Sequence, residues 1–348
     1  MAAIRASFRM HKKGMFLTFI SIAIIAGVII IFNPTSVDLK KDVSSLKSRV
    51  SNMNDYVFDL ENVYLERALQ ASGRRAVISI IDYMEAKTEV ANQERFLSYF
   101  GLDFQSAFSE ALVEGTLNGE PLALMGGETF PELASEITSA AESAFNVQTE
   151  FGALHINNVT VSQSSPWFVD VDFRVSFKVT TAEETASWQR PAVIKAEISI
   201  ENFEDPYYLV KTLGKYSNKI RKSGTSFNEW DAAKVKDFIR DGKYTHFQDG
   251  KSPSFISRFT NQVTPSVCCG IESLVDPNKL AALGLDSDRD VSYSDYLFWS
   301  TAENCASPPF SLYKVNSIDA EFPNLKFDLG HISKYKLTSD SQLCPPPT

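Results

Sequence analysis

The sequence predicts an α+β fold in four parts: an N-terminal transmembrane helix, a long helical stem, an antiparallel β-sheet and a C-terminal region containing disulfides. We expect the transmembrane helix to continue into the stem, and the stem to pack on the sheet. Three observations predict this order. An uncharged apolar run lies near the N-terminus, a heptad-spaced apolar seam follows it, and the middle of the chain alternates apolar and polar residues.

The apolar run covers residues 15–32 and contains no charged residue. As a helix it would be about 27 Å long, close to the thickness of a bilayer core. Residues 1–14 carry basic but no acidic side chains, which predicts a cytoplasmic leader. We therefore expect a signal-anchor: a single-pass protein of the cell membrane, with a cytoplasmic N-terminus, an extracytoplasmic C-terminal domain and the lipid bilayer around residues 15–32.

The overall composition is that of a globular protein, with 44% hydrophobic and 22% charged residues. The formal net charge is −9, and no basic stripe interleaved with aromatic residues is present. An acidic surface repels the phosphate backbone, so nucleic-acid binding is not expected.

A helical stem is predicted over residues 35–92, because apolar residues recur there at alternating steps of three and four. The seam consists of Val43, Leu46, Val50, Met53, Val57, Leu60 and Tyr64. Such a seam either self-associates with a second copy of the chain or packs against the chain's own strands. We favour packing within the chain, since three heptads are near the lower limit for a coiled coil. Gly73 should weaken the helix by about 1 kcal/mol.

Residues 93–150 are expected to be mainly helical, and residues 151–202 to form an antiparallel meander. Thr129 and Glu132 have the spacing of a capping box at the start of a helix. The stretch PWFVDVDFRVSFKVTT alternates apolar and polar residues, which predicts a strand with one buried face and one solvated face. The long helix is expected to cover the buried face.

Residues 203–348 are expected to form an α+β region that holds all the cysteines. Residues 203–226 show no clear period and are interpreted as a long connection. Ser226 and Glu229 have capping-box spacing before a short helix. The segments SLYKVNSI and HISKYKL are predicted as strands.

The four cysteines are Cys268, Cys269, Cys305 and Cys344. An even number in an oxidising compartment predicts two disulfide bonds, with three connectivities to choose from. A bond between adjacent cysteines would be strained, so we favour Cys268 and Cys269 each pairing with one of the other two. Free buried thiols and a metal site are the alternatives, although the sequence has no CxxC motif.

Two further sites are suggested by short motifs. Asn158 begins the sequon Asn-Val-Thr and is a candidate glycosylation site. Asp286, Asp288 and Asp290 begin like an EF-hand loop and are a candidate calcium site. The loop lacks the glycine and the glutamate that an EF-hand needs at its sixth and twelfth positions, so a solvated acidic turn is the alternative.

No catalytic residues and no cofactor are predicted. The histidines at positions 155, 246 and 331 show no HExxH motif and no other spacing typical of metal ligands. There is no GxSxG motif for a serine nucleophile, and the paired glycines in LMGGE are not followed by the GK[ST] of a phosphate-binding loop.

The N-terminal layout resembles that of type IV pilins and their archaeal relatives. The residues that carry this resemblance are the basic HKKG, the apolar stretch that begins MFLTF, one long helix and then an antiparallel sheet. It implies cleavage by a prepilin peptidase between Gly14 and Met15. The glutamate that assists pilin assembly corresponds to Phe19 in this sequence. The chain is also similar to archaeal single-pass surface proteins whose anchor begins with KKGMF.

We therefore expect a membrane-anchored, extracytoplasmic protein with a structural or adhesive role at the cell surface, pilin-like in layout. Its expected partners are other surface proteins and, through the stem, a second copy of itself. The alternative is an extracytoplasmic ligand-binding or sensing module. A membrane-tethered enzyme is a third hypothesis, disfavoured because no catalytic group stands out.

Overall fold

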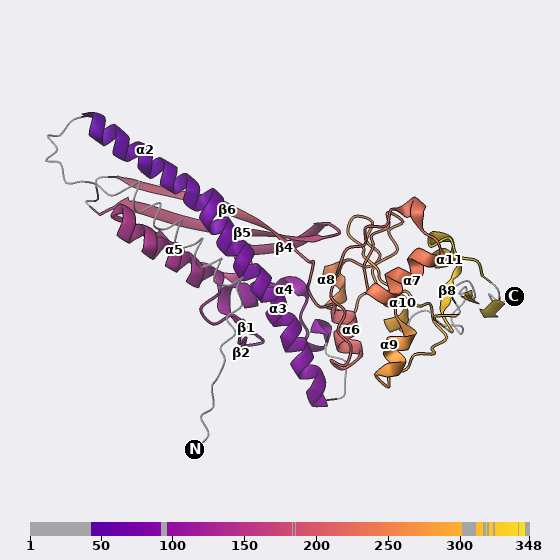
Figure 1. Ribbon diagram of the computed structural model, residues 1–348. Helices are drawn as coiled ribbons and strands as arrows, with labels where there is room; N and C mark the ends of the chain where they lie inside the picture. Colours follow the sequence, from indigo (N-terminus) through magenta and orange to yellow (C-terminus); the bar gives the residue numbers. More distant parts are fainter. Residues whose placement is uncertain are drawn as a thin grey trace, which may run out of the picture.

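A long helix forms the spine of the protein in the computed structural model (Figure 1). It consists of α2 (Val43–Asp59), the π-helical turn η1 (Leu60–Tyr64) and α3 (Leu65–Ala91). At 1.5 Å per residue it is about 70 Å long. The structure describes residues 43–91, 96–182, 184, 186–300, 311–315, 318, 320–322, 324–339 and 341–344.

Among those residues, no helix is both long enough and apolar enough to cross a membrane. This finding corrects the predicted fold class and the predicted localisation, both of which included a single transmembrane helix. The predicted leader (1–14), the predicted transmembrane helix (15–32) and the peptidase site at Gly14 and Met15 lie outside the described residues. The described fold is α+β, with helices and sheets as expected for the remainder.

A four-stranded antiparallel sheet lies along the long helix (Figure 1). Its central strand is β5 (Phe168–Thr181), which pairs with β6 (Ser187–Ser199) along almost its whole length. The other edge of β5 is shared by β3 (Val147–Phe151) and β4 (Val159–Ser165). The alternation predicted for β5 is confirmed, because its apolar side chains at 169, 171, 173, 175, 177 and 179 are all buried.

Helices cover the buried face of this sheet, as the sequence predicted. Helix α3 contacts β6, while α4 (Phe104–Glu114) and α5 (Phe130–Phe145) contact α3 and the strands β4 and β3 respectively. The capping box that begins α5 is formed by Thr129 and Glu132, as expected. Short elements complete this part: η2 (Leu97–Phe100), η3 (Ile156–Asn158) and a hairpin of β1 (Thr116–Leu117) and β2 (Glu120–Pro121). We call residues 43–202 the shaft.

Gly73 allows the long helix to lie close to its neighbours in the shaft. A Cβ atom at this position would be 2.5 Å from Cδ1 of Ile198 on β6 and 3.2 Å from Cζ of Phe108 on α4. From the sequence alone, Gly73 was expected only to weaken the helix. The structure shows that packing requires a glycine at this position.

We expect Gly73→Leu to lower the free energy of unfolding by about 1–3 kcal/mol, because the added side chain has no space between α3, β6 and α4. Urea denaturation followed by circular dichroism measures this loss. Ala71→Leu is the matched control, since Ala71 is exposed on the same helix. Equal stability of the two variants would contradict the packing explanation.

The second part of the chain, which we call the head, comprises the described residues from 203 to 344 (Figure 1). Its helical segments are α6 (Pro206–Lys211), η4 (Phe227–Glu229), α7 (Ala232–Asp241), α8 (Phe255–Arg258), α9 (Pro277–Ala282), α10 (Asp295–Trp299) and α11 (Leu329–Lys334). A small antiparallel sheet has the order β8–β7–β9, formed by β7 (Leu312–Lys314), β8 (Lys326–Asp328) and β9 (Ser341–Cys344).

Two predictions for the head were wrong. HISKYKL was predicted as a strand, but residues Leu329–Lys334 form α11, because the Asp328 carboxylate accepts a hydrogen bond from the backbone N–H of His331 and caps the helix. The predicted long connection over residues 203–226 contains α6, which Asp205 caps in the same way. The capping box at Ser226 and Glu229 is formed as predicted.

The head is fixed to the shaft by a shared hydrophobic core. The rings of Phe104 on α4 and Phe259 after α8 have centroids 4.6 Å apart, and the N–H of Leu97 donates to the carbonyl oxygen of Phe259 at 2.8 Å.

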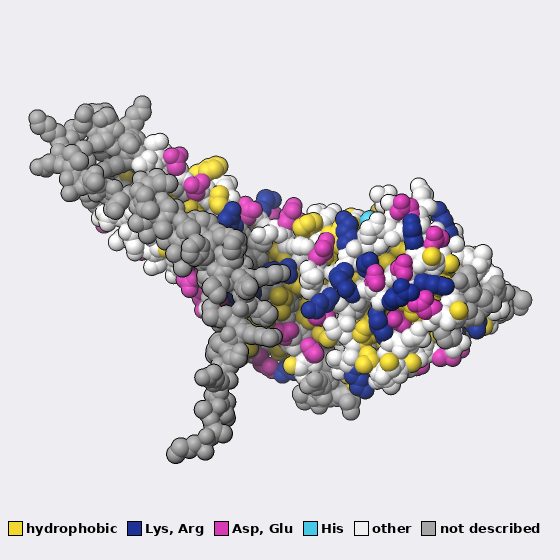
Figure 2. All heavy atoms as spheres, viewed as in Figure 1, with side chains coloured by type: hydrophobic (Ala, Val, Ile, Leu, Met, Phe, Trp, Pro, Cys, Tyr) yellow, Lys and Arg dark blue, Asp and Glu magenta, His cyan; other side chains and the backbone are white. Residues whose placement is uncertain are grey.

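Figure 2 shows Lys, Arg, Asp and Glu side chains interspersed with hydrophobic ones over the visible face of the head. That face therefore carries no extended region of a single charge.

Candidate ligand-binding site

An open pocket of about 610 Å³ lies in the head, between the loop that follows Thr245 and helix α11. The loop contributes His246, Phe247, Gln248 and Asp249. Helix α11 contributes Gly330, Ser333 and Lys334. Thr245 is held by paired backbone hydrogen bonds to Glu272, so the loop starts from a fixed position.

Lys334 forms the charged wall of the pocket. Its Nζ lies 2.8 Å from Oε2 of Glu272 and 3.1 Å from Oδ2 of Asp249, and it lies over the ring of Phe247 at 4.5 Å from the centroid. Burial alone would lower the pKa of Lys334, but the charges of Glu272 and Asp249 outweigh burial and raise it. The ammonium group is therefore charged, and both of its carboxylate partners lie within the head.

Glu272 lies behind this wall and is fully buried. Besides Lys334, its carboxylate accepts hydrogen bonds from the hydroxyls of Tyr335, at 2.7 Å, and Ser252. Burial would raise the pKa of Glu272, but the positive charges of Lys334 and His331 hold it well below its usual range. A buried glutamate with these partners remains ionised.

His331 connects Glu272 to a second carboxylate. Its Nδ1 bonds to Oδ2 of Asp328, and its Nε2 lies 3.6 Å from Oε1 of Glu272 and 3.3 Å from the hydroxyl of Tyr296. Burial would lower the pKa of His331, but the two carboxylates raise it to about 9. The imidazole is therefore protonated at neutral pH, and both ring nitrogens donate.

A separate buried charge cluster lies deeper in the head, around Arg258. Its Nη1 lies 2.6 Å from Oδ2 of Asp205 and 2.7 Å from Oδ2 of Asp295, and all three side chains are fully buried. Burial raises the pKa of Asp295 to about 6 despite the opposing charge of Arg258. The hydroxyls of Tyr244 and Ser273 donate to Asp205 and Asp295 respectively. This cluster has no opening to solvent, and we interpret it as part of the framework.

Three side chains in the pocket have polar groups left for a ligand. The amide of Gln248 and the hydroxyl of Ser333 are exposed and form no hydrogen bond with any other residue that the structure describes. His246 uses Nδ1 to donate to the carbonyl oxygen of Gly270 at 2.7 Å, so its Nε2 is an acceptor in the neutral ring. The pocket thus combines paired charges with unpaired hydrogen-bonding groups.

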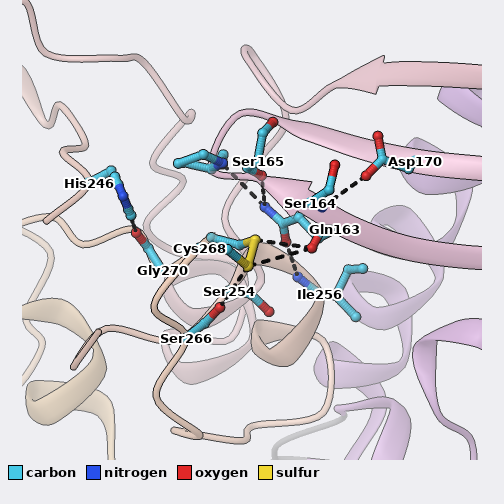
Figure 3. The surroundings of a disulfide bond; sticks show 12 residues. Gln163, Ser164, Ser165, Asp170, His246, Ser254, Ile256, Ser266, Cys268 and Gly270 are labelled. Atoms are coloured by element: carbon cyan, nitrogen blue, oxygen red, sulfur yellow. Dashed lines mark hydrogen bonds between the residues drawn. A yellow bond between two sulfur atoms is a disulfide. The ribbon is translucent and has the colours of Figure 1, made fainter. Parts of the chain in front are cut away.

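A disulfide between the adjacent residues Cys268 and Cys269 lies beside the pocket loop (Figure 3). The sulfur of Cys269 lies 3.0 Å from the carbonyl oxygen of Gln163 on β4, which brings this turn of the head against the shaft. The next residue, Gly270, is bound by His246 and has no space for a side chain, because a Cβ would lie 2.2 Å from the carbonyl oxygen of Ser252.

The favoured cysteine pairing was therefore wrong, since Cys268 and Cys269 are bonded to each other. The strain expected between neighbouring cysteines did not exclude the bond, which lies in a turn directly before Gly270. Cys344 is also disulfide-bonded, and Cys305 lies outside the described residues.

The candidate calcium site is occupied by a lysine. The Nζ of Lys326 lies 2.8 Å from Oδ1 of Asp288 and 2.9 Å from Oδ1 of Asp290, while Asp286 lies near Arg289. In the part of the chain that the structure describes, no three His, Cys, Asp or Glu side chains are arranged to hold a metal ion. The geometry therefore gives no support to the calcium interpretation.

The seam of the long helix is largely used within the chain. Met53, Val57 and Leu60 are buried in the core, whereas Val50 and Tyr64 are partly exposed. Val43 and Leu46 fall on a stretch whose side chains the structure does not describe. This arrangement agrees with the favoured interpretation that the seam packs within the chain.

Asn158, the candidate glycosylation site, ends η3 and is partly exposed. Its side-chain amide donates to the carbonyl oxygen of Ala153 at 3.5 Å.

Three histidines were considered in the sequence. His155 is exposed on the shaft, His246 lines the pocket, and His331 lies behind it.

The pocket itself was not found from the sequence. The charged residues in the pocket wall and behind it come from positions 249, 272, 328, 331 and 334, and only those near α11 are close in the chain. The one local signal was the spacing of Asp328, His331 and Lys334, which fits one helix face but was interpreted as part of a strand.

Comparisons with protein-family models, curated proteins and solved structures found no match to this chain.

Proposed function

We propose that this chain is a binding protein with an adhesive role, in which the shaft supports the head and the head pocket takes up a small polar ligand. The observation that carries the proposal is the contrast inside the pocket. The buried charges of Lys334 and Glu272 are paired with each other, whereas the amide of Gln248 and the hydroxyl of Ser333 are exposed and bond to no other residue that the structure describes. A rigid charged framework with free hydrogen-bonding groups at its surface is suited to recognition.

The fixed connection between head and shaft supports the same proposal. Gln163 on β4 faces the disulfide turn, and its side-chain carbonyl accepts a hydrogen bond from the N–H of Ile256 on α8 at 3.5 Å (Figure 3). A pulling force on the shaft is therefore transmitted to the head through these contacts. This is the mechanical arrangement that an adhesive protein needs.

The test is thermal unfolding of the full chain in the presence of neutral monosaccharides, amino acids, inorganic anions and divalent cations, one compound at a time. A ligand at about 100 times its Kd stabilises a protein by about 2.7 kcal/mol, which raises Tm by several degrees. We expect at least one compound to raise the Tm of the wild type and not that of Ser333→Trp, whose indole takes up space at the α11 wall of the pocket.

Ser135→Trp is the matched control. Ser135 is an exposed serine on helix α5 of the shaft, far along the chain from the pocket. It should respond to the ligand as the wild type does. A shift that persists in Ser333→Trp would place binding elsewhere, and the absence of any shift would count against a binding role for this pocket.

A further inference from the structure

The ionised groups at the pocket cancel one another. Lys334 and His331 face the carboxylates of Asp249, Glu272 and Asp328, which leaves one negative charge in excess. Lys251 lies near Asp328 and makes the number of positive and negative groups equal. A Cβ on Gly330 would lie 2.9 Å from Oδ1 of Asp328 and 3.3 Å from Nζ of Lys251, which places these two charges close to each other but not in an ion pair.

The charged framework therefore favours neither an anion nor a cation as ligand. An anion near Lys334 would have to displace Glu272 or Asp249 from hydrogen-bonding distance and would also face the remaining carboxylate. A cation near Asp249 would compete with an ammonium group that is already 3.1 Å away. Either ligand would have to break an internal ion pair, and that loss opposes its binding.

The pocket groups without a hydrogen bond to another described residue include both donors and acceptors. The amide of Gln248 offers donors and acceptors, the hydroxyl of Ser333 is both, and Nε2 of His246 is an acceptor when the ring is neutral. The hydroxyl groups of a sugar are also both donors and acceptors, so each can bond to any of these side chains. The pocket volume of about 610 Å³ is within the range of small-molecule sites.

We propose that the ligand of the head pocket is a neutral saccharide, held by Gln248, Ser333 and His246 rather than by a charge. The inference rests on the proposed function and specifies its ligand class. Gln248 lies on the loop and Ser333 on α11, so one sugar ring bonded to both would bridge the two walls of the pocket.

The experiment compares sugars that share a ring and differ in charge. Isothermal titration calorimetry of the full chain would use D-glucose, D-galactose and D-mannose, each beside its uronic acid and its 2-amino derivative. We expect at least one neutral sugar to bind and its two charged counterparts to bind at least about tenfold more weakly, since they introduce a charge without a partner. Tighter binding of a uronic acid or an amino sugar would overturn the proposal.

Gln248→Leu tests the role of Gln248 in sugar binding, because leucine is similar in size to glutamine but can neither donate nor accept a hydrogen bond. We expect about a tenfold rise in Kd, with Tm unchanged in the absence of sugar. Gln148→Leu, an exposed glutamine on β3, is the matched control and should bind as the wild type does. If no neutral sugar binds, the saccharide assignment fails. The wider compound series with Ser333→Trp then decides separately whether the pocket binds anything else.

Discussion

Replacing Arg258 by methionine is expected to lower the free energy of unfolding by about 3–5 kcal/mol. The guanidinium group is fully buried and lies within hydrogen-bonding distance of two buried carboxylates, at 2.6 Å from Asp205 and 2.7 Å from Asp295. It also donates to the backbone carbonyl of Ile271. Methionine fills a similar volume but leaves both carboxylates without their cation, and ionised groups in such a site are strongly unfavourable.

Urea unfolding of the full chain at neutral pH measures this effect. Arg240→Met is the matched control, because Arg240 also contacts two carboxylates, those of Asp237 and Glu321, but on the exposed surface of the head. Surface ion pairs contribute little, so its loss should be much smaller. Similar losses for the two variants would show that burial does not decide the strength of these pairs.

A second variant separates loss of the arginine from general damage to the core. Asp295→Asn removes one of the two carboxylates whose charges Arg258 compensates. The double variant Arg258→Met/Asp295→Asn should therefore lose less stability than the two single changes together. Strictly additive losses would contradict the coupling assigned to this cluster.

The parts of the fold that could be predicted are those whose signal is local in the sequence. Strand β5 alternates over its length, and the side chains predicted to face the core are the ones that are buried. The helix beginning at Thr129 was predicted from a capping box that depends on two residues three positions apart. The long helix was predicted from its apolar spacing, although Gly73 was understood only when Ile198 was seen beside it.

The parts that could not be predicted depend on contacts between distant residues. Helix α11 was mistaken for a strand, because its apolar residues are too few to distinguish the two periods and the signal of its cap, Asp328, was overlooked. Glu272 carries no local sign of its role, since its partner Lys334 is far away in the chain. Cysteine pairing is likewise a property of the folded turn rather than of cysteine spacing.

The stability of the head should fall as the pH rises from about 6.5 to 9, and His331 should account for most of that fall. The two carboxylates beside His331 raise its pKa from 6.5 to about 9. A group whose pKa is raised on folding stabilises the folded state fully below its unfolded pKa and loses that contribution as the pH passes its folded pKa. A shift of this size corresponds to about 3 kcal/mol.

The other charged groups around His331 titrate outside this interval. Asp328 and Glu272 have pKa values held below their usual range, so their contribution is lost only in acid, and the raised pKa of Lys334 moves its deprotonation further to the alkaline side. Asp295, with a pKa of about 6, affects stability mainly below the interval. The unfolding free energy between about pH 6.5 and 9 therefore reports chiefly on His331.

His331→Gln should abolish most of this pH dependence. The variant should be clearly less stable than the wild type near pH 6.5, where it leaves Glu272 and Asp328 without the imidazolium, and the two proteins should converge as the pH approaches 9. His155→Gln changes an exposed histidine on the shaft and should keep the wild-type slope. Urea unfolding at a series of pH values measures both. A parallel decline in His331→Gln and the wild type would mean that the charges behind the pocket are not coupled as the geometry indicates.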